Sequence, residues 1–366
     1  MTPTRYCGSK TIASNLSSSK VSAAACPQQA DRRGLRPLIW VAGLLALFAA
    51  AAPAAGRLDA GEITRFVGEM STHHGFDPTA LNALFSRAAR LDSVLAAISR
   101  PAEYKPWHAY RPIFLTRDRI NGGVTFWREH AAVLADAAKV SGVPAEIIVA
   151  IIGVETSYGR NTGSYRVLDA LATLAFHYPK RAPFFRSELE NFLLLTREEN
   201  MDPMQPTGSY AGAMGLPQFM PSSFRNYAVD FDADGRRDIW RNPRDAIGSV
   251  GNYLKRHGWQ AGEVIATPAA QSAANAVQIS DTIELKHTLA EYAALGVRPL
   301  EALGPQAEAA PAVLLAYESS ASATEYWLGL RNFYAITRYN RSPKYALAVV
   351  QLADAIARAH ARGATP

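Results

Sequence analysis

The chain has 366 residues, of which 48% are hydrophobic and 19% charged, and its 38 Lys and Arg against 32 Asp and Glu give a formal net charge of +6. That length supports a large core in roughly two domains, and the composition excludes a disordered or collagen-like protein. Residues 1–56 hold six basic residues and one acidic residue, so they carry +5 of this charge and leave a nearly neutral body. Such a body lacks the overall positive field of a nucleic-acid-binding protein, and no nucleic-acid partner is expected.

Residues 1–56 have the pattern of an export signal. Basic residues precede an apolar run at 38–50, and small residues follow it up to Gly56. The run is shorter than the ~20 residues that a membrane-spanning helix needs. We therefore predict a signal peptide with an N-terminal extension, with an uncleaved membrane anchor as the alternative. Because Cys7 and Cys26 both precede the run, the exported chain would lack disulfides and rest on its core or on a metal ion.

Helical patterns fill the region 58–141. Apolar residues recur there at helical spacing, with an interruption at 107–115. A new helix start follows at Gly142–Glu146, where Pro144 suits a first turn. Residues 147–154 are apolar on almost every side, which predicts a helix at the centre of its domain.

Glu155 closes this apolar helix. It lies on the same stripe as Ile148 and Ile151, close to the helix C-terminus. Desolvation and the negative end of the helix dipole both disfavour an ionised carboxylate there, so we expect a raised pKa. A carboxylic acid that stays protonated near neutral pH can donate a proton to a glycosidic oxygen. Taken alone, a glutamate at such a position is more often a capping or ion-paired residue, so the assignment depends on the surrounding sequence.

A loop of small, aromatic and amide residues lies further along the chain. Helical patterns at 167–176 and 184–195 come first, and the loop at 209–221 reads Ser-Tyr-Ala-Gly-Ala-Met-Gly-Leu-Pro-Gln-Phe-Met-Pro. Small residues let a backbone approach a ligand closely, while Gln and Tyr can bind sugar hydroxyls and ring faces. Helix–helix packing explains the same composition equally well.

A calcium-binding pattern follows this loop. Asp230, Asp232 and Asp234 occupy positions 1, 3 and 5 of a calcium loop, a glycine holds position 6, and the carbonyl of Arg236 holds position 7. Position 12 departs from the pattern, because Arg241 replaces the usual glutamate. We predict a calcium ion that braces the fold, with a solvated acidic turn as the alternative.

Beyond Trp259 the pattern changes to short strands separated by Pro- and Ala-rich segments. A short helix at 289–295 interrupts them, and the final run at 345–361 predicts a C-terminal helix that packs back on residues 58–141. The strand-like runs are 264–267, 312–317 and 325–330.

Three segments together resemble one known family. Glu155–Gly159, Ser209–Ser223 and Tyr339–Ser342 match, in order and wide spacing, the lytic murein transglycosylase B family of bacterial peptidoglycan-cleaving enzymes, glycoside hydrolase family 103. The resemblance covers most of residues 58–360. It implies a mainly α, α+β fold with a lysozyme-like catalytic core, a helical domain and a small β domain.

The resemblance also suggests domain boundaries. The expected divisions are a signal peptide with its extension (1–56), a helical domain (57–141 with 341–366), a lysozyme-like core with the calcium loop (142–262 with 323–340) and a small β domain (263–322).

The implied reaction cleaves the β-1,4 bond between N-acetylmuramic acid and N-acetylglucosamine. Glycosidases usually employ two carboxylates, but this family resembles substrate-assisted enzymes. Glu155 would protonate the leaving oxygen while the N-acetyl group stabilises C1, and would then take the proton of the C6 hydroxyl. The product is a 1,6-anhydromuramoyl end, formed without water. A hydrolysing muramidase and a non-catalytic peptidoglycan-binding protein are the alternatives.

The family pattern assigns further residues. It places Ser209 beside Glu155 and Gln218 against sugar amides or hydroxyls, and Asp245 would close the calcium loop. For two of the cleft tyrosines, Tyr110 and Tyr345, a packing role in the core is about as plausible. The remaining positions implied to line the cleft are Tyr253, Tyr339 and Asn340.

The resemblance sets the expected cofactors and partners as well. Calcium is the expected ion and no organic cofactor is expected, since the sequence holds no nucleotide-binding loop or dinucleotide fingerprint. Glycan strands of peptidoglycan are the expected partner, other cell-wall enzymes are further candidates, and the protein is expected to be a monomer. Its expected location is the periplasm, or the inner membrane if the signal stays uncleaved.

Overall fold

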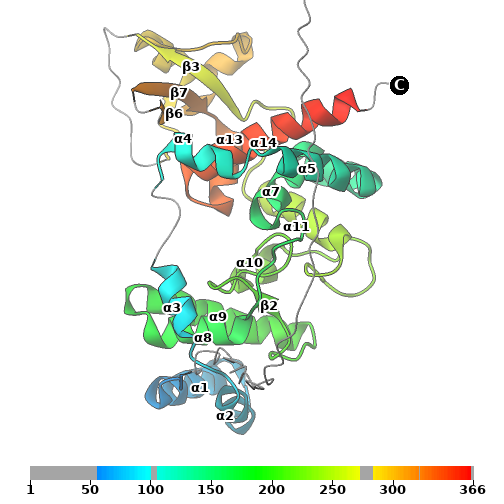
Figure 1. The fold of residues 1–366 in the computed structure, drawn as a ribbon, viewed down its shortest axis with the longest axis vertical. Coiled ribbons are helices and arrows are strands. Elements are labelled where there is room, and N and C mark those ends of the chain that lie inside the picture. The colour runs from blue at the N-terminus through cyan, green and yellow to red at the C-terminus, as the bar shows by residue number, and fades with distance from the viewer. Residues whose placement is uncertain (1–55, 100–104, 273–282, 321, 364–366) are drawn as a thin grey trace, which may run out of the picture. The chain divides into compact units, whose positions relative to one another are not determined.

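The computed structural model describes residues 56–99, 105–272, 283–320 and 322–363 (Figure 1). The predicted signal segment apart from Gly56, and both cysteines, lie outside the described residues. Helices dominate the described part, which confirms the mainly α class with a small β component. The helices are α1 (Ala60–His74), α2 (Pro78–Ser86), α3 (Asp92–Ile98), α4 (Trp107–Tyr110), α5 (Arg117–Glu129), α6 (Ala131–Ser141), α7 (Ala145–Thr156), α8 (Val167–His177), α9 (Ala182–Glu198), α10 (Pro221–Tyr227), α11 (Pro243–Arg256), α12 (Leu289–Ala294), α13 (Arg331–Tyr339) and α14 (Pro343–Arg362).

Helix α7 lies at the centre of the helical packing. It contacts α5, α6, α11 and α14, and its residues 147–153 are all buried. This confirms the prediction of a central helix from a run that is apolar on almost every side. The C-terminal helix α14 packs on α5 as well as on α7, so the predicted return of the chain end to the region 58–141 is also confirmed.

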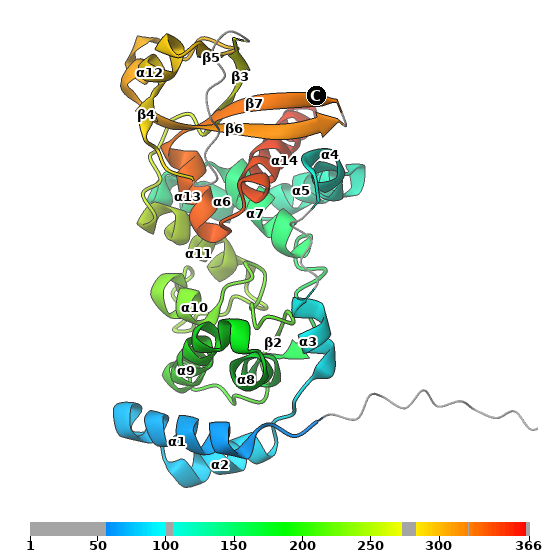
Figure 2. The ribbon, with the colours of Figure 1, turned by 90° about the vertical axis from the view of Figure 1, so that its left-hand side faces the viewer.

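A second group of helices surrounds α8 and α9. Helix α3 packs on α8, and Phe66 of α1 meets Phe176 of α8 at 5.9 Å between ring centroids. Arg186 of α9 is paired with Glu62 and Glu69 of α1 at 3.1 and 2.8 Å. Figure 2 shows α1 and α2 on the far side of α8 and α9 from α7.

The five-stranded antiparallel sheet has the order β4-β6-β7-β3-β5. Its core contains Leu314 and Leu328, directly opposite each other on β6 and β7, together with Val297 and Leu289. The strands are β3 (Ala266–Gln271), β4 (His287–Thr288), β5 (Val297–Pro299), β6 (Pro311–Ser320) and β7 (Ala323–Gly329), and a separate two-stranded pair joins β1 (Tyr165–Arg166) to β2 (Thr207–Gly208).

The sheet corrects one detail of the predicted domain boundaries. The division between 263–322 and 323–340 separates β6 from β7, yet these strands are hydrogen-bonded neighbours and β7 also pairs with β3. The strand at 323–329 therefore belongs to the sheet, because its backbone groups are satisfied there. Residues 53–366 form one compact unit, so the other boundaries stay predictions.

The region 107–115, where the helical pattern is interrupted, forms the short helix α4 and the 3-10 turn η2 (Arg111–Ile113). Trp107 of α4 donates from Nε1 to Glu325 of β7 at 2.7 Å. Tyr317 of β6 donates from its hydroxyl to the carbonyl of Pro343, at the start of α14. The first bond ties α4 to the sheet and the second ties the start of α14 to it, and α14 carries one residue of the site described next.

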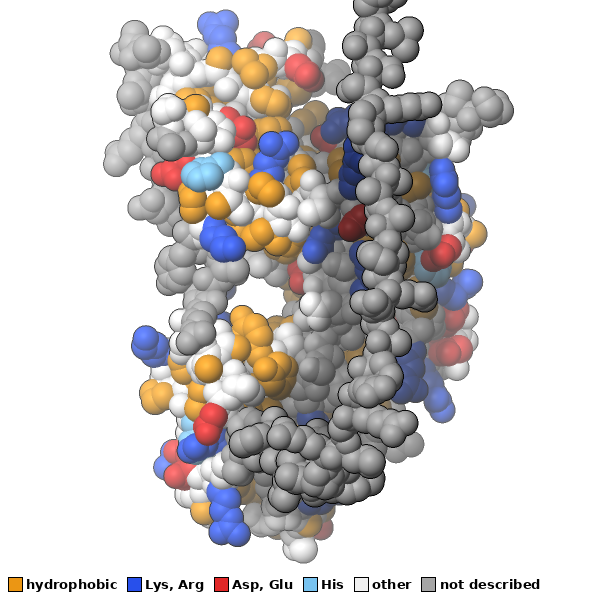
Figure 3. All heavy atoms as spheres, in the orientation of Figure 1, with side chains coloured by type: hydrophobic (Ala, Val, Ile, Leu, Met, Phe, Trp, Pro, Cys, Tyr) orange, Lys and Arg blue, Asp and Glu red, His pale blue; other side chains and the backbone are white. Residues whose placement is uncertain are grey.

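Charges of both signs are interspersed on the described part of the face drawn in Figure 3, as expected for a nearly neutral body. Among the described residues no single helix is long and apolar enough to cross a membrane. Helices α6 and α7 reach that length only together, and they meet at an angle of 111°.

Candidate active site

Glu155 lies in the last turn of α7 and is partly exposed to solvent. The hydroxyl of Tyr345, from α14, donates to its Oε1 at 2.5 Å. Burial raises the pKa of Glu155 to about 7, and the hydrogen bond from Tyr345 opposes that rise. The raised pKa agrees with the expectation from the sequence. A carboxyl group with this pKa is present in both protonation states near neutral pH, as a group that gives and later accepts a proton requires.

The chain turns sharply directly after Glu155. Ser157, Tyr158 and Gly159 have φ angles of 52°, 64° and 84° in sequence, a left-handed conformation that is costly for the two residues with side chains. Tyr158 is held by its hydroxyl, which donates to the carbonyl of Arg119 at 2.7 Å. The turn therefore depends on where the Tyr158 side chain is anchored.

The ring of Tyr158 fills a slot lined by three glycines. Added Cβ atoms at Gly122 and Gly123 of α5 and at Gly153 of α7 would lie 2.9, 2.7 and 2.5 Å from Tyr158 atoms. Real Cβ atoms do not approach that closely, so each position excludes a side chain unless Tyr158 moves, and at Gly123 Ile356 would have to move as well. This slot was not predicted from the sequence, although two adjacent glycines inside a helix are a signal, because they weaken the helix.

Arg119 is a second residue that the sequence analysis missed. Its guanidinium donates to the carbonyls of Gly153 and Val154, the latter at 3.3 Å. The carbonyl of Gly153 also accepts from the backbone N–H of Ser157, so Arg119 adds a second donor there and a donor for Val154. A cation at this point also offsets the negative end of the helix dipole. No spacing rule connects Arg119 of α5 to Glu155, so only the tertiary structure reveals the pairing.

Hydrogen bonds bring the three family-like segments together. Thr156, beside Glu155, donates from Oγ1 to the carbonyl of Leu216 at 3.1 Å. Gln218 donates from Nε2 to the carbonyl of Thr162 at 3.1 Å. Tyr339 donates from its hydroxyl to the carbonyl of Pro217 at 2.6 Å. The loop at 209–219 thus lies between the end of α7 and the end of α13.

Ser209 shapes this loop. Its Oγ accepts from the backbone N–H groups of Ala211 and Ala213 at 3.3 and 3.1 Å. No hydrogen bond joins Ser209 to Glu155 among the described residues, so its expected place beside that carboxyl group stays a prediction. Asn340 has a comparable local role, because its Oδ1 accepts from the backbone N–H of Ser342, the N-cap of α14.

Aromatic side chains line the region around Glu155. Tyr345 and Tyr339 are parallel, with ring centroids 6.5 Å apart and 9° between planes. Tyr253 lies 4.7 Å from Tyr339 and donates from its hydroxyl to the carbonyl of Arg338. Tyr110 is buried and packs against Phe114. Of the two tyrosines left open between core and cleft, Tyr345 is buried yet bonded to Glu155, whereas Tyr110 has the packing of a core residue.

The acidic loop brings three carboxylates together. Asp230, Asp232 and Asp245 each offer an oxygen, and these oxygens all lie within 4.8 Å of one another. Asp232 has a buried Oδ1 with no hydrogen-bond partner among the described residues. Asp245 is fully buried, and burial is the main cause of its raised pKa. An unpaired buried carboxylate oxygen among three acids fits a divalent cation with oxygen ligands. Asp234 is outside this cluster, and its Oδ1 accepts from the backbone N–H of Arg236.

A carboxyl group of raised pKa at the end of the central helix is the kind of group that a glycoside-cleaving enzyme uses as its acid. The family model of the transglycosylase SLT domain matches residues 59–354. The chain is 46% identical over 305 residues to the membrane-bound lytic murein transglycosylase B of Escherichia coli K12, covering 81% of this chain and 82% of that protein. The chain therefore belongs to the transglycosylase SLT family, and the resemblance to lytic murein transglycosylase B is confirmed.

Three solved structures are similar along most of the chain. Soluble lytic transglycosylase SltB1 from Pseudomonas aeruginosa is 54% identical, with a TM-score of 0.77, covering 83% of this chain and 100% of that one. E. coli Slt35 in complex with calcium is 44% identical, with a TM-score of 0.74 and coverage of 84% and 97%. P. aeruginosa SltB3 in complex with NAG-anhNAM-pentapeptide is 32% identical, with a TM-score of 0.71 and coverage of 81% and 78%.

These similarities confirm the fold class and the function expected from the resemblance. The protein is a lytic transglycosylase with a lysozyme-like fold, and it cleaves peptidoglycan between N-acetylmuramic acid and N-acetylglucosamine to leave 1,6-anhydromuramoyl ends. The hydrolysing and non-catalytic alternatives are not favoured.

Proposed function

We propose that Glu155 carries both proton transfers of this reaction. Protonated Glu155 donates its proton to the glycosidic oxygen as the bond from that oxygen to C1 breaks, and the substrate N-acetyl oxygen bonds to C1. The Glu155 carboxylate then removes the proton of the C6 hydroxyl. The C6 oxygen bonds to C1 and displaces the N-acetyl oxygen, so Glu155 ends protonated and ready for the next bond.

The observation that carries this proposal is a single carboxyl group with a pKa of about 7. Burial and the Tyr345 hydroxyl account for that shift, whereas glycosidases with two acids depend on a second carboxylate about 5 to 9.5 Å away. One titrating acid suffices if the substrate provides both nucleophiles. Mass spectrometry of muropeptides released from sacculi tests the proposal, since the anhydro ends should disappear when Glu155 is replaced.

The other site residues have supporting roles in this proposal. Gln218 donates to backbone carbonyls from Nε2, which leaves its Oε1 to accept from sugar amides or hydroxyls. Tyr339 and Asn340 complete the sugar-binding surface, and Ser209 holds the loop in shape. Tyr253 and Tyr110 are buried and brace the residues that touch the glycan.

Replacing Tyr345 with phenylalanine should move the pH profile. The hydroxyl of Tyr345 donates to the Glu155 carboxylate, which favours the ionised form. Loss of the hydroxyl therefore raises the pKa of Glu155 above its value of about 7. The basic limb of the pH profile of kcat/KM then shifts to higher pH. Steady-state cleavage rates between pH 5 and 9 measure the shift. Tyr292→Phe, which removes a hydroxyl within the sheet region, is the control and should keep the limb in place. A basic limb at the same or a lower pH in Tyr345→Phe than in the unsubstituted enzyme would exclude this role of the Tyr345 hydroxyl.

We also propose that calcium binds the acidic loop. Asp230, Asp232 and Asp245 would be its carboxylate ligands, with Asp234 and the carbonyl of Arg236 as further ligands from the loop pattern. The calcium complex of E. coli Slt35 supports the choice of metal. The ion would tie the loop to α11, which carries Asp245, and it would stabilise the fold without taking part in the chemistry.

Calcium should raise the melting temperature of the protein. Saturation at about a hundred times Kd stabilises a folded protein by about 2.7 kcal/mol, so we expect a rise of several degrees that a chelator reverses. Asp245→Asn should lose this response, while Asp136→Asn, at an exposed position of α6, should retain it. Differential scanning calorimetry with and without calcium measures the effect, and equal melting temperatures for the unsubstituted protein would contradict the assignment.

The location follows from the same reasoning. The E. coli relative is named as membrane-bound, and a peptidoglycan-cleaving enzyme must reach the cell wall. We therefore place this protein in the periplasm as a monomer, exported by residues 1–56, and held at the inner membrane if that segment stays attached. Glycan strands are its substrate, other cell-wall enzymes are candidate partners, and no organic cofactor takes part.

A further inference from the structure

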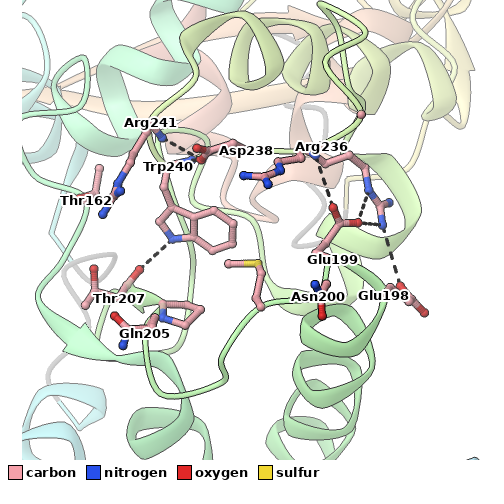
Figure 4. A pocket seen from close by; sticks show the side chains of 14 residues that line it. Thr162, Glu198, Glu199, Asn200, Gln205, Thr207, Arg236, Asp238, Trp240 and Arg241 are labelled. Carbon is pink, nitrogen blue, oxygen red and sulfur yellow. Dashed lines mark hydrogen bonds and ion pairs between the residues drawn. The ribbon is translucent and has the colours of Figure 1, made fainter.

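A pocket of about 780 Å³ lies beside the loop that contacts the end of α7. Residues after α7, the C-terminal end of α9 and the segment before α11 form its walls. Figure 4 shows Thr162, Thr207, Trp240 and Arg241 together at one end, and Glu198 and Glu199 at the other. The volume suits a short peptide or a small molecule.

The pocket shares its wall with the active-site loop. The carbonyl of Thr162, which lines the pocket, accepts from Gln218. Leu216 donates from its backbone N–H to the carbonyl of Ile239, the residue before Trp240. The pocket is therefore joined to the active-site loop by direct hydrogen bonds.

The charges in the pocket are arranged unevenly. Glu198 is paired with Arg225 at 2.7 Å, and Glu199 is paired with Arg237, so the acidic end is neutralised within the protein. Asp238 also lines the pocket, and its Oδ1 accepts from the backbone N–H groups of Trp240 and Arg241 at 2.9 Å each. The side chains of Arg236 and Arg241 are exposed and make no hydrogen bond or ion pair with any residue that the structure describes. Two guanidinium groups are therefore available to an anionic ligand.

Trp240 provides an apolar surface at the end of the pocket where Arg241 lies. Its Nε1 donates to the carbonyl of Thr207 at 3.0 Å, and its ring packs on Phe224 with 5.8 Å between centroids. The ring is thus fixed in place, while the side chain stays partly exposed and lines the pocket. A rigid aromatic ring at the same end as a free guanidinium group suits a ligand that has both a carboxylate and small apolar groups.

We propose that this pocket binds the terminal carboxylate of a peptide stem on the glycan strand, an inference that rests on the proposed function of Glu155. A stem that is free at its end has such a carboxylate, whereas a stem joined to its neighbour through that group does not. Arg241 would bind the carboxylate through charge-assisted, paired hydrogen bonds, Trp240 would pack against the stem, and Arg236 would add positive charge to the same pocket. The pocket would therefore favour strands with free stems over strands cross-linked through this group.

Synthetic glycan strands of equal length, with stems ending in either a carboxylate or an amide, test this assignment. We expect the unsubstituted enzyme to have a KM about tenfold lower for the carboxylate form with a similar kcat, because this contact binds substrate and transition state alike. Arg236→Ala/Arg241→Ala should remove the preference, and Arg241→Lys should keep part of it, since the charge remains but the planar fork is lost. Arg298→Ala, at an exposed position of β5, is the matched control and should keep the full preference.

The outcomes separate this inference from the function on which it rests. Equal KM values for the two strands with the unsubstituted enzyme, or an unchanged preference in the double variant, would overturn the pocket assignment. Failure to form anhydro ends from either strand would instead refute the proposed role of Glu155. Melting curves with calcium check that the double variant retains the acidic loop, whose carbonyl ligand at position 236 survives the substitution.

Discussion

Replacing Glu155 with glutamine should lower kcat for the release of anhydromuropeptides by about a thousandfold or more. General acid–base groups contribute about 10² to 10⁴ in rate, and this residue would serve in both proton transfers. An amide has nearly the same shape and can still accept a hydrogen bond from Tyr345. It cannot donate the proton that the leaving oxygen needs, so the loss should appear in kcat while binding of the glycan persists.

A matched control exists on the same helix. Glu146 lies in the first turn of α7, at the opposite end from Glu155, and Glu146→Gln should cleave sacculi at the rate of the unsubstituted enzyme. Quantitative chromatography of released muropeptides measures both variants. If Glu155→Gln retained activity within tenfold of the control, a different acid would have to carry the reaction.

Replacing Gly153 with alanine should damage both the fold and the site. The new Cβ would lie 2.5 Å from the Tyr158 hydroxyl oxygen and 2.7 Å from Cζ. The ring has little room to retreat, because Gly122 and Gly123 line the slot as well and the hydroxyl is bonded to the carbonyl of Arg119. Overpacking of this kind typically costs about 1–3 kcal/mol. We expect a melting temperature lower by several degrees, and a lower kcat because the turn after Glu155 shifts.

Gly68 provides the control for this substitution. It lies inside α1, is exposed, and has no atom within 4 Å of an added Cβ. Gly68→Ala should therefore stabilise the protein by roughly 0.5–1 kcal/mol, because alanine favours a helix. In a protein that already carries Tyr158→Ala, Gly153→Ala should lower the stability less than it does in the unsubstituted protein. A Gly153→Ala protein that melts and reacts like the unsubstituted one would show that the slot is not tightly packed.

The sequence predicted the elements whose signals are local. The apolar run at 147–154 identified the central helix, and the 3.6-residue spacing identified α8, α9 and α14. Desolvation and the helix dipole predicted the raised pKa of Glu155 from its position alone. The convergence of the segments around 155, 218 and 339 came from the family resemblance, because no local rule brings residues so far apart in sequence together.

Features that depend on tertiary contacts were not predicted. Arg119 meets the end of α7 only after the helices pack, and Tyr158 enters a slot built from two helices. The strand β7 was assigned to the wrong side of a boundary because its partners, β6 and β3, are set by long-range pairing. The pocket around Trp240 and Arg241 joins three separated segments, so its composition is not visible as a motif.

The central claim is that Glu155 moves the protons while the substrate provides its own nucleophiles. Digestion of purified sacculi in heavy-oxygen water, followed by mass spectrometry of the new muramoyl ends, tests it most directly. We predict anhydro ends that carry no label and are lighter by one water than hydrolysed ends, and their loss in Glu155→Gln. Labelled reducing ends from the unsubstituted enzyme would contradict this mechanism.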